Sequence, residues 1–254
     1  MTADSVVLTE RRGPVLVITL NRPEARNAVD AALAHGLGRA LDELDADDAL
    51  AVGVLTGAGR AFSSGMDLKA FVSGERPTYG DRGFAGIVER PPVTPLIAAV
   101  EGFALGGGCE IALACDLIVA AHDARFGIPE VKRSLVAAGG ALLRLPRRVP
   151  SAIAMELALT GEPIGAERAQ AVGLVNALAE PGSALDVALA LADRIAANGP
   201  LALSATKRIL SENWPEAEFW ARQREIARPV FASEDAREAA RAFAEKRAPV
   251  WSGR

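Results

Sequence analysis

The sequence predicts an α/β fold with a helical C-terminal part. In the first two-thirds of the chain, short apolar runs that end in glycine turns alternate with segments of helical periodicity. From about residue 182 the strand signals cease, and helices are expected at 183–197, 200–212, 215–230 and 233–246. We therefore predict an α/β core over residues 1–181 and a helical subdomain over residues 182–254.

The N-terminal region begins with two predicted strands, residues 5–10 and 14–20. They flank Arg11-Arg12-Gly13, which is typical of a β-hairpin turn. An amphipathic helix is expected next, because apolar side chains recur on one stripe: Val29, Leu33, Leu37, Leu41 and Leu44. Residues 51–55 predict a buried strand, and the turn at 61–69 leads into a short helix.

Residues 72–92 are rich in glycine, proline and charged side chains. This composition predicts a mobile surface loop or short helix, and such segments often border binding sites. Beyond residue 130, the turn Ala138-Gly139-Gly140 leads a helix that ends in a basic cluster at 144–148. The remaining core elements are expected as helices at 151–160 and 165–171 and a short strand or turn at 173–176.

The stretch from residue 98 to residue 130 contains the candidate catalytic groups. An apolar run breaks at Gly106-Gly107-Gly108, resumes as a short buried helix, continues as a strand at 117–121 and ends at a second turn. Glu110 and Glu130 interrupt this apolar stretch. Burial raises the pKa of a carboxyl group, which suits a general acid or base. Three glycines at a helix start leave backbone N–H groups uncovered, and these can hold negative charge on an oxygen.

Each glutamate also has a purely structural interpretation. Glu110 falls in the first turn of the expected helix, where the helix dipole favours a carboxylate. Pro129-Glu130 is an ordinary helix start. Taken singly, either side chain is better explained as a helix-end residue, so a catalytic interpretation depends on the rest of the chain.

Composition limits the classes of function. A chain of 254 residues with a net charge of −4 has no general attraction to nucleic acid or anionic membranes. The N-terminus lacks the pattern of a signal peptide and no apolar run is long enough to span a membrane, which favours a cytoplasmic protein. The two cysteines, Cys109 and Cys115, are interpreted as core thiols. The two histidines, His35 and His122, have no metal-ligand spacing, so no metal site is predicted.

Three motif-like segments lack the residues that would complete them. Residues 52–59, VGVLTGAG, lack the further glycines and the following helix of a dinucleotide-binding turn. The only tyrosine, Tyr79, is followed four residues later by Gly83, where a short-chain dehydrogenase has lysine. Ser63 and Ser64 lack the GxSxG context of a serine hydrolase.

Several motifs, in order and over nearly the whole chain, resemble the crotonase or enoyl-CoA hydratase/isomerase superfamily. These motifs are TLNRP at 19–23 with Asn27-Ala28, AFSSGMDLK at 61–69, ALGGGCE at 104–110, FGIPE at 126–130 and AFAEKR at 242–247. The resemblance implies repeated ββα turns, a helical C-terminal trimerisation region, and assembly as trimers or dimers of trimers. It also implies an acyl-CoA thioester as substrate, with coenzyme A entering only as part of that substrate and no separate cofactor.

The resemblance assigns roles by position. The backbone N–H groups of Met66 and Gly107 would form an oxyanion hole for the thioester enolate. Glu110 would position and activate a water that adds at C3, and Glu130 would deliver a proton to C2. The alternative is that the Met66 side chain only fills space in the core. Its backbone N–H could still form part of the oxyanion hole.

Coenzyme A would be bound by the turn from Ser64 to Lys69, largely through its backbone. The candidate contacts are Arg26, Ser64, Met66, Asp67, Leu68, Lys69, Phe243 and Lys246. Arg26 and Lys69 suit the phosphates, although each is equally well explained as a solvated surface charge. The family resemblance places Phe243 and Lys246 near the coenzyme A of a neighbouring subunit; the alternative is a helix-face aromatic and an exposed lysine.

Retention of both glutamates favours an enoyl-CoA hydratase. Two regions depart from common short-chain hydratases: the run at 131–140 and the segment 72–92. Both would shape the acyl pocket, so a carnitinyl-CoA-type dehydratase, a hydratase for a bulky acyl group or an isomerase stays open. A non-catalytic acyl-CoA binder or RNA binder is the alternative of another class, and the acidity of the chain disfavours RNA.

Overall fold

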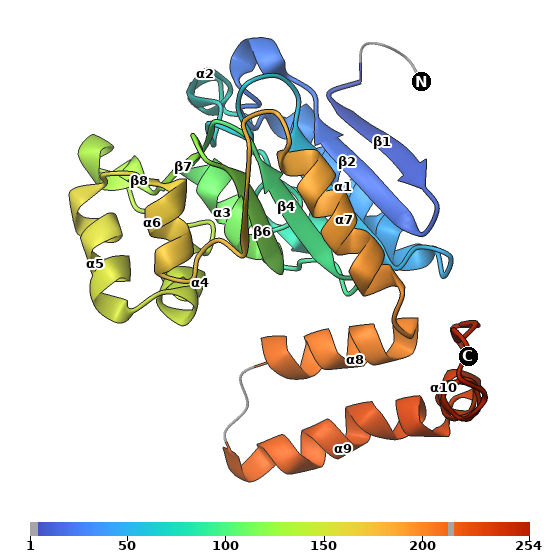
Figure 1. Cartoon of the computed structure of the whole chain (residues 1–254). Coiled ribbons are helices and arrows are strands. Elements are labelled where there is room, and N and C mark those ends of the chain that lie inside the picture. Colours follow the sequence, from blue (N-terminus) through green and yellow to red (C-terminus); the bar gives the residue numbers. More distant parts are fainter. Residues whose placement is uncertain (1–4, 213–215) are drawn as a thin grey trace.

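The computed structural model describes residues 5–212 and 216–254, except for the side chains of Glu216, Ala217, Phe219, Trp220, Phe243 and Ala244. Its main element is a six-stranded sheet (Figure 1) in the order β1-β2-β3-β4-β6-β9. The strands are β1 (Val7–Arg12), β2 (Val15–Leu20), β3 (Val52–Gly57), β4 (Leu96–Val100), β6 (Leu117–Ala121) and β9 (Ala177–Ala179). β1 and β2 form the expected antiparallel hairpin, and the other pairings are parallel.

Alternate side chains of each central strand enter two different apolar clusters, because successive side chains of a strand point to opposite faces. On β2, Leu16 and Ile18 join the cluster on the side of α1 (Ala31–Ala46), whereas Val15 joins the cluster on the other side. α7 (Ala184–Ala196) covers this second face with Ala184, Ala188 and Ala192 at helical spacing. The sheet therefore lies between α1 and α7.

The central stretch folds in the predicted order and supplies parts of both sheets. β4 is followed by β5 (Phe103–Leu105), α3 (Gly107–Ala114), β6, β7 (Arg125–Gly127) and the 3-10 turn η3 (Pro129–Arg133). β5 and β7 pair in a second sheet of three strands, which β8 (Ile164–Gly165) completes. No sequence pattern predicted β8, because a strand of two residues is too short to show any periodicity. The last strand, β9, begins just after the predicted segment 173–176.

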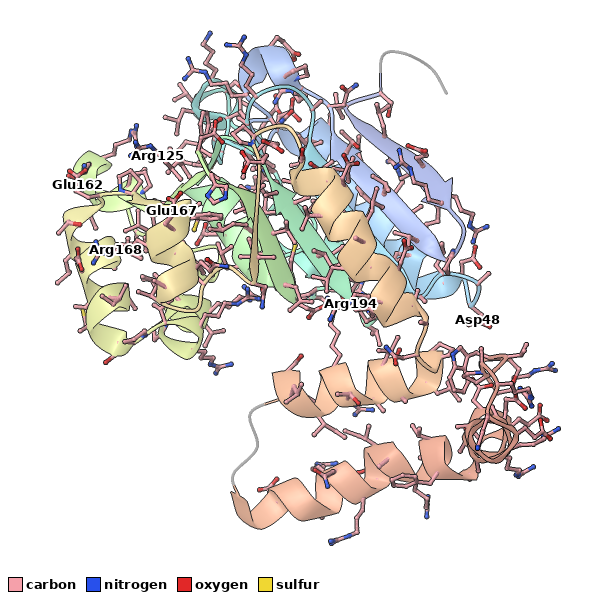
Figure 2. All side chains as sticks on the ribbon, in the orientation of Figure 1. Asp48, Arg125, Glu162, Glu167, Arg168 and Arg194 are labelled. Carbon is pink, nitrogen blue, oxygen red and sulfur yellow. The ribbon has the colours of Figure 1, made fainter. Side chains whose placement is uncertain are left out.

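The other core helices agree with their predicted positions to within a few residues. They are α2 (Leu68–Val72), α4 (Ala141–Arg148), α5 (Ser151–Thr160) and α6 (Ala166–Ala171). Figure 2 labels Glu162 near the end of α5, and Glu167 and Arg168 on α6. Arg168 there pairs with Glu156 at 2.7 Å, and both side chains are exposed enough for the pair to contribute little stability.

The C-terminal helices are α8 (Pro200–Ser211), α9 (Glu216–Ala232) and α10 (Glu234–Glu245). They extend away from the sheet as a separate group of helices (Figure 1). Helices were predicted throughout this region, and helices are found. The division between residues 181 and 182 stays a prediction; α7, which follows it, packs on the sheet.

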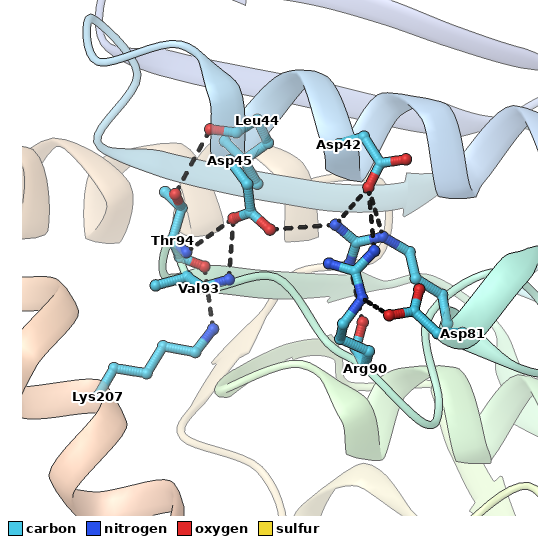
Figure 3. A network of polar contacts seen from close by, with 9 residues as sticks. Asp42, Leu44, Asp45, Asp81, Arg90, Val93, Thr94 and Lys207 are labelled. Carbon is cyan, nitrogen blue, oxygen red and sulfur yellow. Dashed lines mark hydrogen bonds and ion pairs between the residues drawn. The ribbon is translucent and has the colours of Figure 1, made fainter.

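The segment 72–92 is more buried than its composition suggested. It contains the 3-10 turn η2 (Gly80–Arg82), and Arg82, Ala85, Ile87 and Val88 are all buried. The guanidinium of Arg82, which has no solvent exposure, donates to Asp42 at 2.8 Å and Asp45 at 3.1 Å on α1. Figure 3 shows these two aspartates. The expectation of a surface loop is therefore wrong for these residues, because a charge that is paired and hydrogen-bonded can be buried.

No helix in residues 5–212 and 216–254 has the length and apolar content needed to cross a membrane.

We predict that Arg82→Met lowers the free energy of unfolding by about 2–3 kcal/mol, because it leaves Asp45 largely buried without its cation. Asp42 is partly exposed, which limits the loss. Arg90→Met is the matched control, because Arg90 pairs with Asp42 and Asp81 from a side chain that is 46% exposed. Urea denaturation at matched protein concentration measures both; equal effects of the two variants would contradict the prediction.

Candidate active site

Glu110 lies in the first turn of α3, as predicted, and its side chain is directed into the core. The residue is only 4% exposed. One carboxylate oxygen, Oε1, accepts a hydrogen bond at 3.2 Å from the backbone N–H of Ala141, at the start of α4. Gly139 packs against the other oxygen, since a Cβ atom at this position would lie 2.5 Å from Oε2. Position 139, two residues before α4, must therefore hold a very small residue for the carboxylate to occupy this position.

Burial raises the pKa of Glu110 to about 7. The hydrogen bond from Ala141 opposes this shift, and the negative charge of Glu130 adds to it. The carboxyl group is consequently poised to exchange a proton near neutral pH, which is the property that a general acid or base requires.

Glu130 lies in the first turn of η3 and is half-buried beside the N-terminus of α3. Gly106 immediately precedes α3, and a Cβ atom there would lie 3.2 Å from Oε1 of Glu130. Burial raises the pKa of Glu130, against the opposing effects of its own backbone N–H and the charge of Arg133. Its Oε2 atom is buried without a hydrogen-bond partner. The two glutamates are thus brought together, and one of them has a buried oxygen that accepts no hydrogen bond from the residues that the structure describes.

Two backbone N–H groups meet near this carboxyl pair. Gly65 has a φ of +86° and touches the start of α3 so closely that a Cβ atom would lie 2.7 Å from the nitrogen of Gly107. The flanking hydrogen bonds, Val29 N–H to Gly65 at 2.8 Å and Asp67 N–H to Val29 at 2.9 Å, fix the chain on both sides of Met66. Within the described residues, the N–H groups of Met66 and Gly107 donate no hydrogen bond to the protein.

Phe84 forms a wall of the site that the sequence did not single out. A Cβ atom at Gly107 would lie 2.6 Å from the Cζ atom of Phe84, so the ring lies directly against this glycine. Phe84 belongs to the segment 72–92, which was expected only to border the site. Ala141 and Gly139 were also missed as contacts of Glu110; the paired glycines at 139 and 140 were the one available signal.

The predicted coenzyme A turn lies beside these N–H groups. Arg26 and Lys69 are exposed, and the backbone of Ser64 is held by a hydrogen bond to the carbonyl of Arg26 at 3.0 Å. Leu68 is 47% exposed at the start of α2.

The carboxylate of Asp67 is occupied within the protein, because it caps α2 and accepts from Arg22 at 3.2 Å. Although burial opposes the charge of Asp67, its hydrogen bonds lower the pKa of this carboxyl.

The two C-terminal candidates are distant from this turn within one chain. Lys246 is exposed just beyond α10, and Figure 1 shows α10 at the opposite end of the molecule from α2. The side chain of Phe243 lies outside the described residues. Lys246 is therefore too far away to contact the turn of its own chain.

Several known proteins are similar to this chain over its whole length. An enoyl-CoA hydratase from Mycobacterium tuberculosis is 60% identical in sequence, with a TM-score of 0.97, and the match covers 99% of this chain and 100% of that one. Enoyl-CoA hydratase EchA19 from the same species is 44% identical over 97% of this chain and 96% of its own. A carnitinyl-CoA dehydratase of Salmonella typhi is 43% identical over 99% of this chain and 100% of its own.

The fold and the site define an enzyme of the crotonase class. The enoyl-CoA hydratase/isomerase family model matches residues 10–254, and the chain belongs to this family. The predicted resemblance and the predicted crotonase-like α/β fold are confirmed.

We predict that Glu110→Gln stabilises the fold in a pH-dependent manner. The pKa rises from an ordinary 4.5 to about 7 on folding, so the native state holds this proton more tightly than the unfolded chain. The associated stability is complete below about pH 4.5 and is lost as the pH rises through about 7. Glutamine cannot ionise, so the variant should gain about 2–3 kcal/mol over the wild type at alkaline pH and little at acidic pH. Urea denaturation across this range tests the prediction; a pH-independent difference would contradict it.

Proposed function

We propose that the protein is an enoyl-CoA hydratase that adds water across the 2,3 double bond of a trans-2-enoyl-CoA. The observation that carries this proposal is a buried carboxyl group, Glu110, and a half-buried one, Glu130, beside two N–H groups that have no partner in the described protein. Family membership supports an acyl-CoA thioester as the substrate. The full-length similarity to enoyl-CoA hydratases supports hydration in particular.

In the proposed reaction, the N–H groups of Met66 and Gly107 bind the thioester oxygen and stabilise the negative charge that develops there. Glu110, in its ionised form, accepts a proton from water while the water oxygen bonds to C3. The π electrons move onto the thioester oxygen as an enolate, and protonated Glu130 then delivers its proton to C2. One proton passes back from Glu110 to Glu130 to complete the cycle, so the pair titrates as a unit.

The turn from Ser64 to Lys69 is proposed to bind coenzyme A through its backbone, since the Asp67 side chain is already engaged. Arg26 and Lys69 are exposed cations near the same turn and suit the phosphates. Phe243 and Lys246 are proposed to reach the coenzyme A of a neighbouring subunit. This assignment requires self-association of the chain. As a separate proposal, the protein acts on acyl-CoA in the cytoplasm.

A carnitinyl-CoA-type dehydratase is the second candidate, because relatives of that name are 43% identical over their whole length. The same two carboxyl groups can run the reaction in the dehydrating direction, by removing the proton at C2 and expelling water from C3. The substrate rather than the catalytic pair separates these candidates.

We predict that Glu110→Gln and Glu130→Gln each lower turnover of trans-2-enoyl-CoA by at least about 100-fold, because each removes one proton-transfer group. The loss of the conjugated enoyl-thioester absorbance measures the reaction across substrates of increasing chain length. Glu180→Gln, on an exposed side chain, is the control and should retain wild-type turnover.

Wild-type protein that binds acyl-CoA but consumes none of these enoyl-CoA substrates would refute the hydratase proposal. Assay with carnitinyl-CoA then tests the dehydratase, migration of the double bond tests an isomerase, and salt-dependent retention of RNA tests the nucleic-acid alternative.

We predict a mass in solution of three or six times the 26.4 kDa of one chain. The supporting observation is that α8 and α9 expose large apolar side chains, with Leu210 80% and Phe231 81% exposed. Analytical ultracentrifugation over a range of concentrations measures the mass, and Phe231→Glu should shift it toward that of one chain. A single-chain mass at every concentration would contradict the prediction.

A further inference from the structure

Arg144, on α4, has a buried polar atom for which the proposed function gives no explanation. Among the described residues, the buried side-chain polar atoms without a partner are Oε2 of Glu130 and Nη1 of Arg144. The first faces the proposed reaction site. The second belongs to a guanidinium whose other nitrogen, Nη2, donates to the backbone carbonyl of Val88. A buried donor without a partner costs free energy, so its position calls for a physical reason.

The guanidinium folds back onto the N-terminus of its own helix. A Cβ atom at Gly140 would lie 2.3 Å from Nη1 of Arg144. Gly140 has a φ of +96° and directly precedes Ala141, the residue whose N–H donates to Glu110. Arg144 is therefore in contact with the turn that presents the hydrogen-bond donor of Glu110.

The same guanidinium reaches the second wall of the site. Val88, which accepts its hydrogen bond, lies four residues after Phe84, and Phe84 packs against Gly107. Arg144 thus joins two backbone segments that meet in the site: the start of α4, which orients Glu110, and the segment that holds Phe84 against α3. A planar group with several fixed donors suits this bridging position better than a lysine ammonium would.

The charge of Arg144 also acts on Glu110. Burial lowers the pKa of Arg144, but an arginine stays protonated at any physiological pH. The charged or titratable groups that influence the pKa of Arg144 are Arg147 and Arg148 on α4, Cys115 and Glu110. Glu110 in turn faces Glu130, which disfavours its ionisation, and Arg144, which favours it. Cys109 beside it stays a neutral thiol, because burial raises the pKa of Cys109 to about 12.

We propose that Arg144 is a positioning residue for the hydration reaction: its guanidinium fixes the Ala141 donor and the Val88 segment around Glu110. This inference rests on the proposed function. It adds a requirement that the glutamate pair alone does not contain: a nearby cation opposes the effect of Glu130 on the ionisation of Glu110.

The pH dependence of kcat/KM tests the proposal. Arg144→Gln keeps a donor for Val88 but removes the charge, so the acidic limb should move to higher pH by about one pH unit. Arg144→Lys keeps the charge, so its acidic limb should stay at the wild-type position while kcat falls several-fold, because one ammonium cannot hold both segments. Arg147→Gln, an exposed arginine on the same helix, is the matched control and should move neither.

A readout without turnover separates this inference from the proposed function. Infrared spectroscopy of protein labelled with 13C-glutamate follows the ionisation of Glu110, which the Glu110→Gln spectrum assigns. If no enoyl-CoA is turned over, the hydratase proposal fails, yet the displaced titration in Arg144→Gln still tests the charge effect. Three results would each overturn the role of Arg144. The titration of Glu110 could stay unmoved in Arg144→Gln, or move equally in Arg147→Gln, or Arg144→Lys could keep the wild-type kcat. Should Arg144→Gln not fold, the kcat of Arg144→Lys decides.

Discussion

The burial of the Glu110 carboxyl group is the constraint on which the rest of the site depends. A buried carboxylate is costly unless it has a hydrogen-bond donor or holds a proton. The backbone N–H groups of Ala141 and Gly139 and the charge of Arg144 oppose the effect of burial, which still leaves the pKa of Glu110 raised to about 7. A fully apolar site would raise this pKa further. The intermediate environment is what keeps proton exchange near neutral pH.

Close approach of backbone segments is the second condition, and it explains the glycines around α3. A Cβ atom at Gly108 would lie 2.2 Å from the carbonyl oxygen of Ser63, and one at Gly65 would collide with the nitrogen of Gly107. These contacts bring the turn after β3 against the start of α3. The N–H groups of Met66 and Gly107 can be adjacent only because neither side of the contact carries a side chain at these points.

Local sequence patterns predicted the elements whose periodicity is long enough to read. The stripe from Val29 to Leu44 predicted α1, and residues 151–160 coincide with α5. The same patterns failed at residues 82–88, where charge and glycine content suggested a surface loop. Arg82 is buried there because Asp42 and Asp45 on α1 meet its guanidinium, and no local pattern reports a partner that lies about 40 residues away in the chain.

The sequence by itself determined the α/β class, the order of the elements through residue 130, the family, and the candidacy of Glu110 and Glu130. These follow from local periodicity, glycine placement and ordered motifs, all of which are properties of neighbouring residues. Only the tertiary structure decided which groups surround the two carboxyl groups: Ala141 and Gly139 at Glu110, Phe84 at Gly107, and Arg144 behind them. The physical reason is that pKa and hydrogen bonding depend on what lies across a few ångströms of space, and these neighbours come from segments far apart in the chain.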